Sequence, residues 1–172
     1  MAGPRRRSRE IALQILHQID VGGAPEDVDV MVARYFEHML SHDGPAGEEE
    51  GYEGFGTSSE QSPARIDRPL VEQLVRGVCE HRKELDDQLT ALSQNWRLER
   101  IAIVERNVIR IALYELKYAE NVPVNVVLNE AVELAKRYGT AEGAAFANER
   151  PRGGHFVRVR RVIANFLMHR RT

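Results

Sequence analysis

Apolar residues recur every three or four positions along most of this chain, and this spacing restricts its fold more than any other feature. Between Arg5 and Asp20 the spacing gathers five apolar side chains on one helical face: Ile11, Ala12, Ile15, Leu16 and Ile19. No segment alternates convincingly with the period of two that a half-buried strand requires. The sequence therefore predicts an all-α bundle.

The same spacing predicts four further helical stretches, at residues 25–40, 67–92, 100–118 and 127–138. Residues typical of helix ends support these bounds. Asp67 is expected to cap a helix that has Pro69 in its first turn, and the apolar stripe after it continues to Leu92. Pro123 and Gly139 follow the last two stretches as stop signals.

The length of 172 residues suits one globular domain spanning residues 1–172. Inside it, a loop at about residues 41–64 is rich in Gly, Ser, Glu and Pro, and we expect it to be disordered. Six acids and no Lys or Arg lie between Ser41 and Glu60, whereas residues 149–172 hold seven arginines and one acid. The net charge of −2 therefore hides a strongly polarised chain.

Several protein classes can be set aside. No stretch approaches the roughly 20 apolar residues of a membrane span, and the basic N-terminus lacks the pattern of a signal peptide. A lone Cys79 in an apolar stripe is typical of a core thiol in a reducing compartment, so we expect a cytoplasmic protein. His38 and His42 lack a third metal ligand, and no phosphate loop or nucleophile motif is present. We expect no enzyme activity, cofactor or metal.

Arg5, Arg6, Arg7 and Arg9 form a basic cluster at the start of the first helix. Arginine forks at a helix N-terminus suit the binding of phosphate groups, as in contacts with a nucleic-acid backbone. The alternative is a solvated, frayed chain end.

Three separated segments carry a family resemblance: RRRSREIALQILHQID, WRLERIAIVERNVIRIALYEL and VPVNVVLNEAVELAKRYG. In order and spacing they resemble the NusB family of bacterial transcription antitermination factors. The resemblance implies a compact, non-catalytic bundle of about seven helices. It also implies binding to the boxA RNA of ribosomal RNA transcripts together with NusE, a small-subunit ribosomal protein, within the RNA polymerase antitermination complex.

The resemblance also implies roles for particular residues. RNA-binding positions of the family fall on Arg5, Arg6, Arg7, Arg9, Glu142 and Phe146, and the aromatic ring of Phe146 suits base stacking. NusE-binding positions fall on His17 and Glu105. Some family members dimerise through the RNA-binding face, so both a monomer and a homodimer remain open.

The chain departs from the family after Asn148, where the arginine-rich tail 149–172 replaces the usual sequence of a last core helix. Val159, Ile163 and Phe166 keep helical spacing, so one interpretation is a replacement helix. A reading-frame shift in the gene, which would make this spacing accidental, is the other and slightly favoured one. Two rival functions stay open as well: a detached RNA-binding module of a ribosomal RNA cytosine methyltransferase, and a protein-only assembly scaffold.

Overall fold

The computed structural model describes residues 3–23, 27–41, 66–92, 101–119, 122–138 and 162–164. Within these ranges every regular element is helical, which confirms the predicted all-α fold: α1 (Pro4–Gly22), α2 (Val28–Ser41), α3 (Arg68–Glu80), α4 (Arg82–Leu92), α5 (Ile103–Tyr118), α6 (Val124–Tyr138) and residues 162–164. The predicted acidic loop at 41–64 and most of the tail lie outside the described residues.

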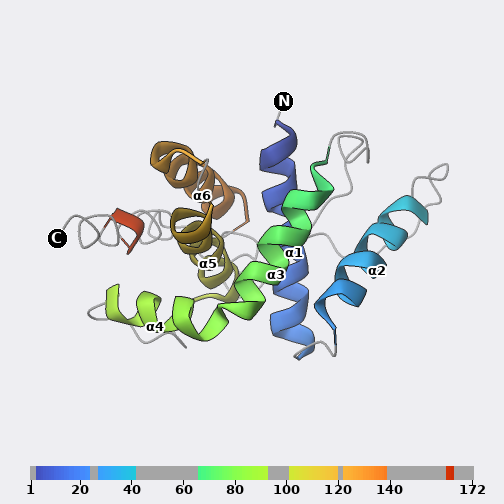
Figure 1. The fold of residues 1–172 in the computed structure, drawn as a ribbon, viewed down its shortest axis with the longest axis horizontal. Helices are drawn as coiled ribbons and strands as arrows, with labels where there is room; N and C mark the ends of the chain where they lie inside the picture. Colours follow the sequence, from blue (N-terminus) through green and yellow to red (C-terminus); the bar gives the residue numbers. More distant parts are fainter. Residues whose placement is uncertain are drawn as a thin grey trace, which may run out of the picture.

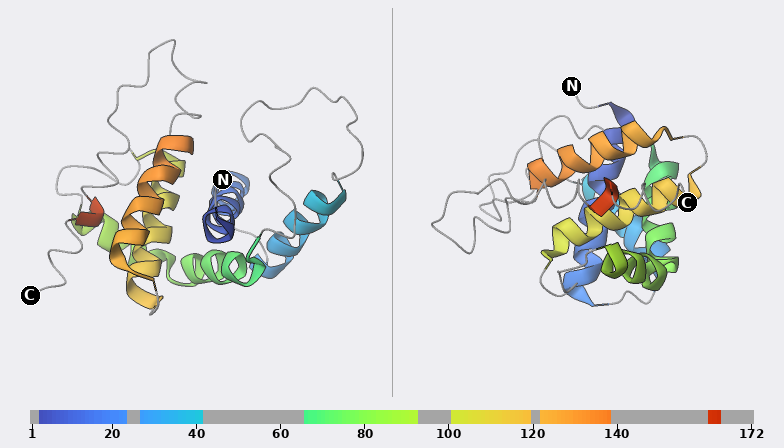
Figure 2. Two further views of the ribbon diagram at one scale, coloured as in Figure 1. Left: turned by 90° about the horizontal axis from the view of Figure 1, so that it is seen from above. Right: turned by 90° about the vertical axis from the view of Figure 1, so that its left-hand side faces the viewer.

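Helix α1 lies at the centre of the molecule. It packs against α3 and α5, while α6 packs on α5 and α2 packs on α3 (Figure 1). Seen from above, α1 stands almost end-on between the α5–α6 pair and α2, with α3 across its side (Figure 2). Its central position explains why Ile11, Leu13 and Ile15 are all at most 2% exposed.

Helices α1 and α5 run antiparallel, as two pairs of polar contacts show. Arg9 near the start of α1 bonds to Glu115 near the end of α5, whereas Asp20 near the end of α1 accepts a hydrogen bond from Asn107 near the start of α5. The beginning of α1 therefore lies beside the end of α5, and the end of α1 beside the beginning of α5.

The start of α3 follows the sequence prediction. The Asp67 side chain accepts a hydrogen bond from the Leu70 backbone N–H at 3.2 Å, and Pro69 lies in the first turn. The backbone N–H of Asp67 donates to Ser8 Oγ at 2.9 Å, so this cap is also tied to α1.

The apolar stripe predicted from residue 67 to 92 is divided between two helices. Helix α3 ends at Glu80 and α4 begins at Arg82, with His81 between them. The His81 ring stacks on Tyr118 of α5, with ring centroids 4.2 Å apart. The break lets the chain turn so that α4 packs on α5 through Leu85 and Leu89, which are fully buried.

The described part of the tail contributes to the core. Val162 and Ile163 are 5% and 0% exposed and belong to the same hydrophobic cluster as the six helices. Because Ile163 is one of the residues at helical spacing, its burial favours the replacement-helix interpretation of the tail over accidental spacing.

Candidate nucleic-acid interface

The four arginines at the start of α1 have very different surroundings. Arg5 is exposed and has no ion-pair partner among the described residues. The Arg6 side chain is 38% exposed. Arg7 and Arg9 are buried, with exposed fractions of 5% and 2%. The cluster that looks uniform in the sequence therefore divides into an exposed pair and a buried pair.

Arg9 forms a buried, two-pronged ion pair with Glu115 of α5. Its Nε donates to Glu115 Oε2 at 2.8 Å and its Nη2 donates to Oε1 at 2.6 Å. The two side chains are only 3% and 2% exposed. A charge this deeply buried needs such a partner, and the parallel bonds fix the geometry of the guanidinium. The contact locks the start of α1 to the end of α5.

Arg7 is held by a second buried carboxylate, that of Glu10. Its Nη1 donates to Glu10 Oε2 at 2.5 Å, and Glu10 Oε1 accepts a further bond from Arg137 of α6 at 2.8 Å. Glu10 is 1% exposed. The Arg7 and Arg9 guanidinium groups are thus engaged inside the bundle and are not accessible to a phosphate in this structure.

Arg6 is paired and still accessible. Its Nε lies 3.0 Å from Glu130 Oε2, and its Nη2 donates to Glu130 Oε1 at 2.8 Å. The hydrogen bond to Glu130 raises the pKa of Arg6 against the opposing effect of burial. Arg6 Nη1 has no partner among the described residues, so this edge of the guanidinium remains for another acceptor.

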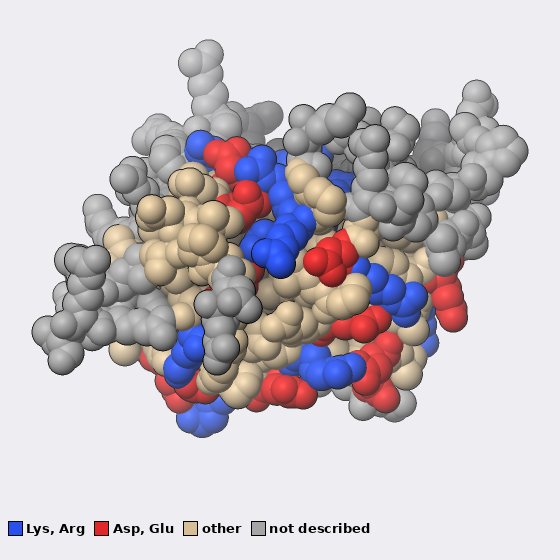
Figure 3. All heavy atoms as spheres, turned by 45° about the horizontal axis from the view of Figure 1, so that its top comes forward, with Lys and Arg blue, Asp and Glu red and all other residues tan. Residues whose placement is uncertain are grey.

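Basic side chains gather at the exposed start of α1, with acidic side chains directly beside them (Figure 3). The surface there carries both positive and negative side chains and is not a continuous basic patch. Arg5 is exposed and can bind an anion, and Arg6 is accessible along one edge of its guanidinium. Glu142 and Phe146, the other predicted RNA-binding residues, lie outside the described residues.

The predicted protein-binding residues lie toward the other end of α1. His17 is half-buried in the second half of α1, and Glu105 lies in the first turn of α5 with 0% of its surface exposed. The antiparallel packing of the two helices places both residues away from Arg5 and Arg6. The Glu105 carboxylate offers no accessible surface in this structure, whereas His17 is partly exposed.

The sequence did not predict which acids pair with these arginines. Glu115 and Glu130 pair with arginines 106 and 124 positions away, and no local pattern marks such distant partners. One ion pair on α6 is local: Lys136 donates to Glu133, three residues earlier, at 3.0 Å.

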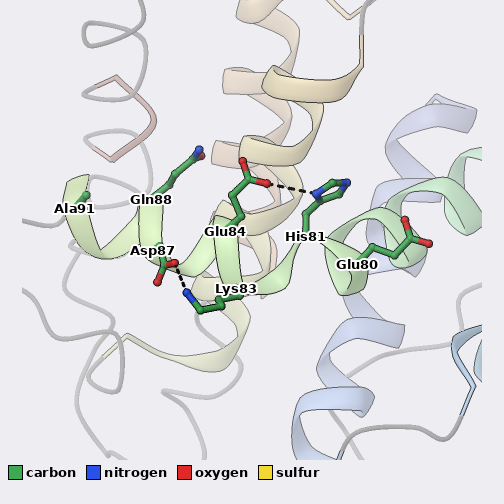
Figure 4. Close-up of a pocket in the computed structure, with 7 residues that line it drawn as sticks. All are labelled: Glu80, His81, Lys83, Glu84, Asp87, Gln88 and Ala91. Atoms are coloured by element: carbon green, nitrogen blue, oxygen red, sulfur yellow. Dashed lines mark hydrogen bonds and ion pairs between the residues drawn. The ribbon is translucent and has the colours of Figure 1, made fainter.

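A hollow beside α4 is unsuited to nucleic acid because acids dominate its lining (Figure 4). Glu80, Glu84 and Asp87 supply three carboxylates, and Lys83 is paired with Asp87 at 2.8 Å. Tyr118 of α5 donates to Glu84 at 2.7 Å and lies 3.1 Å from His81 Nδ1. This network joins α4 to α5.

Among the described residues there is no group of three or more His, Cys, Asp or Glu side chains that could hold a metal ion. In the same part of the chain no helix is long and apolar enough to cross a membrane. Cys79 packs against the core as predicted, and its burial raises the pKa of the thiol.

The sequence profile of the NusB family matches residues 6–149 of this chain. The transcription antitermination protein NusB of Bacillus subtilis (strain 168) is 42% identical over 144 residues, which cover 84% of this chain and 88% of that protein. The protein of the same name from Anaeromyxobacter dehalogenans (strain 2CP-1 / ATCC BAA-258) is 41% identical over 148 residues, covering 86% and 87% of the two chains.

Two solved structures share the fold. NusB of T. maritima superposes with a TM-score of 0.59 at 28% identity, covering 93% of this chain and 92% of that chain. A chain in the crystal structure of a plectonemic RNA supercoil gives a TM-score of 0.63 over 98% of this chain and 96% of that chain. The second match has only 18% identity and shows the fold alone.

Proposed function

Since this chain belongs to the NusB family of transcription antitermination proteins, which are not enzymes, we propose that it is an adaptor that binds single-stranded boxA RNA together with NusE. In this role it joins the RNA polymerase antitermination complex on ribosomal RNA transcripts. One observation carries the proposal: the start of α1 presents Arg5 and one edge of Arg6 to solvent, on a helix anchored by the buried Arg9–Glu115 pair.

The proposal gives different tasks to the two pairs of arginines. Arg5 and Arg6 neutralise phosphates of the RNA backbone, because their guanidinium groups are accessible. Arg7 and Arg9 position them, because their buried bonds to Glu10 and Glu115 fix the first turns of α1. Glu142 and Phe146 remain proposed base-reading residues on the strength of the family resemblance and the stacking chemistry of a Phe ring.

The protein partner is proposed to bind toward the other end of α1. His17 is the accessible member of the predicted pair, whereas the fully buried Glu105 supports the first turn of α5 from within. RNA and NusE would then occupy separate regions, so both could be bound at the same time.

Fluorescence anisotropy with a labelled boxA-like RNA and a scrambled RNA tests the RNA-binding proposal. The expected result is tighter binding to boxA than to the scrambled RNA, weakening as salt rises and strengthening when NusE is added. Equal, weak binding to both RNAs without a NusE effect would contradict the proposal.

Single substitutions then test the assignment of the arginines. Arg5→Ala and Arg6→Ala should each lower the slope of log affinity against log salt by about 0.7, the value for one phosphate contact with a single strand. Arg76→Ala is the matched control, because Arg76 is an exposed arginine that pairs with Asp29 between α3 and α2. If the slope is unchanged in both the Arg5 and the Arg6 variants, RNA must bind elsewhere on the protein.

The His17→Ala variant tests whether RNA and NusE bind to separate regions. It is expected to lose NusE binding and to retain RNA binding.

A further inference from the structure

A cavity of about 330 Å³ lies beside Arg5, where α1, α3 and the end of α5 meet. Leu70 and Leu74 of α3, Tyr114 of α5 and Val122 supply apolar surface. Leu74 and Tyr114 are 1% and 9% exposed, so the walls belong to the packed core and are held in place. The volume is at the lower end of the range for small-ligand pockets, roughly 300–1,000 Å³.

The charged residues that line this cavity carry a net positive charge. Arg9 and Glu115 both line it, and their two-pronged ion pair cancels their charges. Arg5 is the remaining charged residue of the lining, and it is exposed with no ion-pair partner among the described residues. An occupant with an apolar body and one negative charge would match this arrangement.

Gln73 adds a polar group at the edge of the cavity. It is exposed on α3, and its amide can both donate and accept hydrogen bonds. The cavity thus combines apolar walls, a side-chain amide and an exposed guanidinium. Single-stranded RNA offers a complementary set, since an unstacked base has an apolar face and polar edges and is joined to a phosphate.

We propose that this cavity is a subsite for one unstacked base of the bound RNA, with the base against Leu70 and the Tyr118 ring, which are partly exposed members of the lining, its edge toward Gln73 and a neighbouring phosphate on Arg5. The inference rests on the proposed RNA-binding function. It rests on proximity: Arg5, which the proposed function assigns to a phosphate, is exposed and also lines the cavity.

The subsite is tested by measuring RNA affinity after two changes, made singly and together: removal of one base from the RNA, and a substitution that fills the cavity. The probe is the boxA-like RNA with an abasic nucleotide placed at each position in turn. With the unaltered protein, one position should show a loss of affinity of roughly tenfold or more, as expected for a base that stacks on a side chain. Ala119→Leu fills the cavity from the end of α5, so the loss at that one position should disappear while losses at other positions remain.

Gln73→Glu is a second variant that does not disturb packing, because Gln73 is exposed. The added charge should weaken RNA binding several-fold by repelling the phosphate on Arg5. Gln18→Glu makes the same change at an exposed position near the other end of α1 and should leave the affinity within twofold. Thermal melting of each variant confirms that it is folded.

The outcomes separate the subsite from the function on which it rests. No binding of boxA RNA by the unaltered protein would overturn the proposed function itself. A different result would overturn the subsite alone: the protein binds RNA normally, and at every position the losses of affinity from Ala119→Leu and from base removal simply add. So would an Ala119→Leu variant that keeps its RNA affinity but loses NusE binding, since a protein side chain would then be the occupant.

Discussion

At the scale of single residues, the buried Arg9–Glu115 pair gives a direct prediction for stability. Arg9→Ala leaves the Glu115 carboxylate buried without its counter-charge, which should lower the free energy of unfolding by about 3–5 kcal/mol. Urea unfolding followed by circular dichroism measures this loss. Replacing both partners together, as Arg9→Met with Glu115→Leu, should recover most of it, because no unpaired charge then remains.

The control for this prediction is an ion pair at the surface. Arg76 and Asp29 are both more than half exposed, so Arg76→Ala should leave the urea midpoint almost unchanged. If Arg9→Ala and Arg76→Ala shifted the midpoint equally, burial would not be what makes the Arg9–Glu115 pair important.

Tyr138 gives a prediction for alkaline pH. Burial raises its pKa from the usual 10 to about 12 in the folded protein. The unfolded chain therefore loses the phenolic proton first as pH rises. The stabilising contribution is complete below pH 10, and it decreases by roughly 2–3 kcal/mol as pH rises toward 12.

Urea unfolding at pH values from 9 to 11.5 would measure this decrease. Tyr138→Phe has no proton to lose at this position, so its stability should fall less steeply over the same pH range. Parallel curves for the two proteins would show that Tyr138 titrates alike in the folded and unfolded states.

The sequence could show which residues of the site carry charge but not which of them reach solvent. Arg5, Arg6, Arg7 and Arg9 look alike along the chain, and their exposure depends on carboxylates supplied by α5 and α6. The local pair between Lys136 and Glu133 could be predicted because helix geometry alone brings its members together. Long-range pairs need the tertiary fold first.

At the scale of elements, α3 contacts α5 at Gly77, which lies against the Tyr114 ring. A Cβ atom there would overlap the Tyr114 ring, which is itself buried. Gly77→Ala should therefore push the two helices apart or displace the ring, costing about 1–3 kcal/mol in unfolding free energy. The measurement is again a urea titration.

Gly22→Ala is the matched control, because Gly22 is also helical and has no atom within 4 Å of the added methyl group. Alanine favours helix over glycine, so this change should leave stability equal or slightly higher. Opposite signs for the two substitutions would show that the effect at Gly77 comes from helix contact. A neutral Gly77→Ala would mean that α3 and α5 can separate at little cost.

Helix ends could be predicted where neighbouring residues determine them, and not where contacts with another helix do. The start of α3 could be predicted because Asp67 and Pro69 act on their own backbone neighbourhood. The break at His81 could not, because the apolar stripe runs through it unchanged. What distinguishes His81 is its stacking on Tyr118, a residue of another helix.

At the scale of the whole molecule, the tail is expected to contribute to the stability of the bundle. Ile163 is 0% exposed, so Ile163→Ala should lower the unfolding free energy by about 2–5 kcal/mol. Val21→Ala is the control, because Val21 is 64% exposed and outside the core. Differential scanning calorimetry measures both.

Removal of residues 149–172 extends this test to the complete tail. The shortened chain should melt at a clearly lower temperature than the full chain, since it loses the buried Val162 and Ile163. Equal melting temperatures would support the frame-shift interpretation, in which the tail adds no packing.

The division of the arginines at the start of α1 has a practical consequence for purification. Salt screens charges in water strongly and charges inside the bundle only weakly. If Arg5 and Arg6 hold RNA as proposed, concentrated salt should therefore detach it, while the buried Arg9–Glu115 pair keeps the start of α1 attached to α5. A preparation could be stripped of cellular RNA on a column and recovered in its native state, without denaturant or refolding.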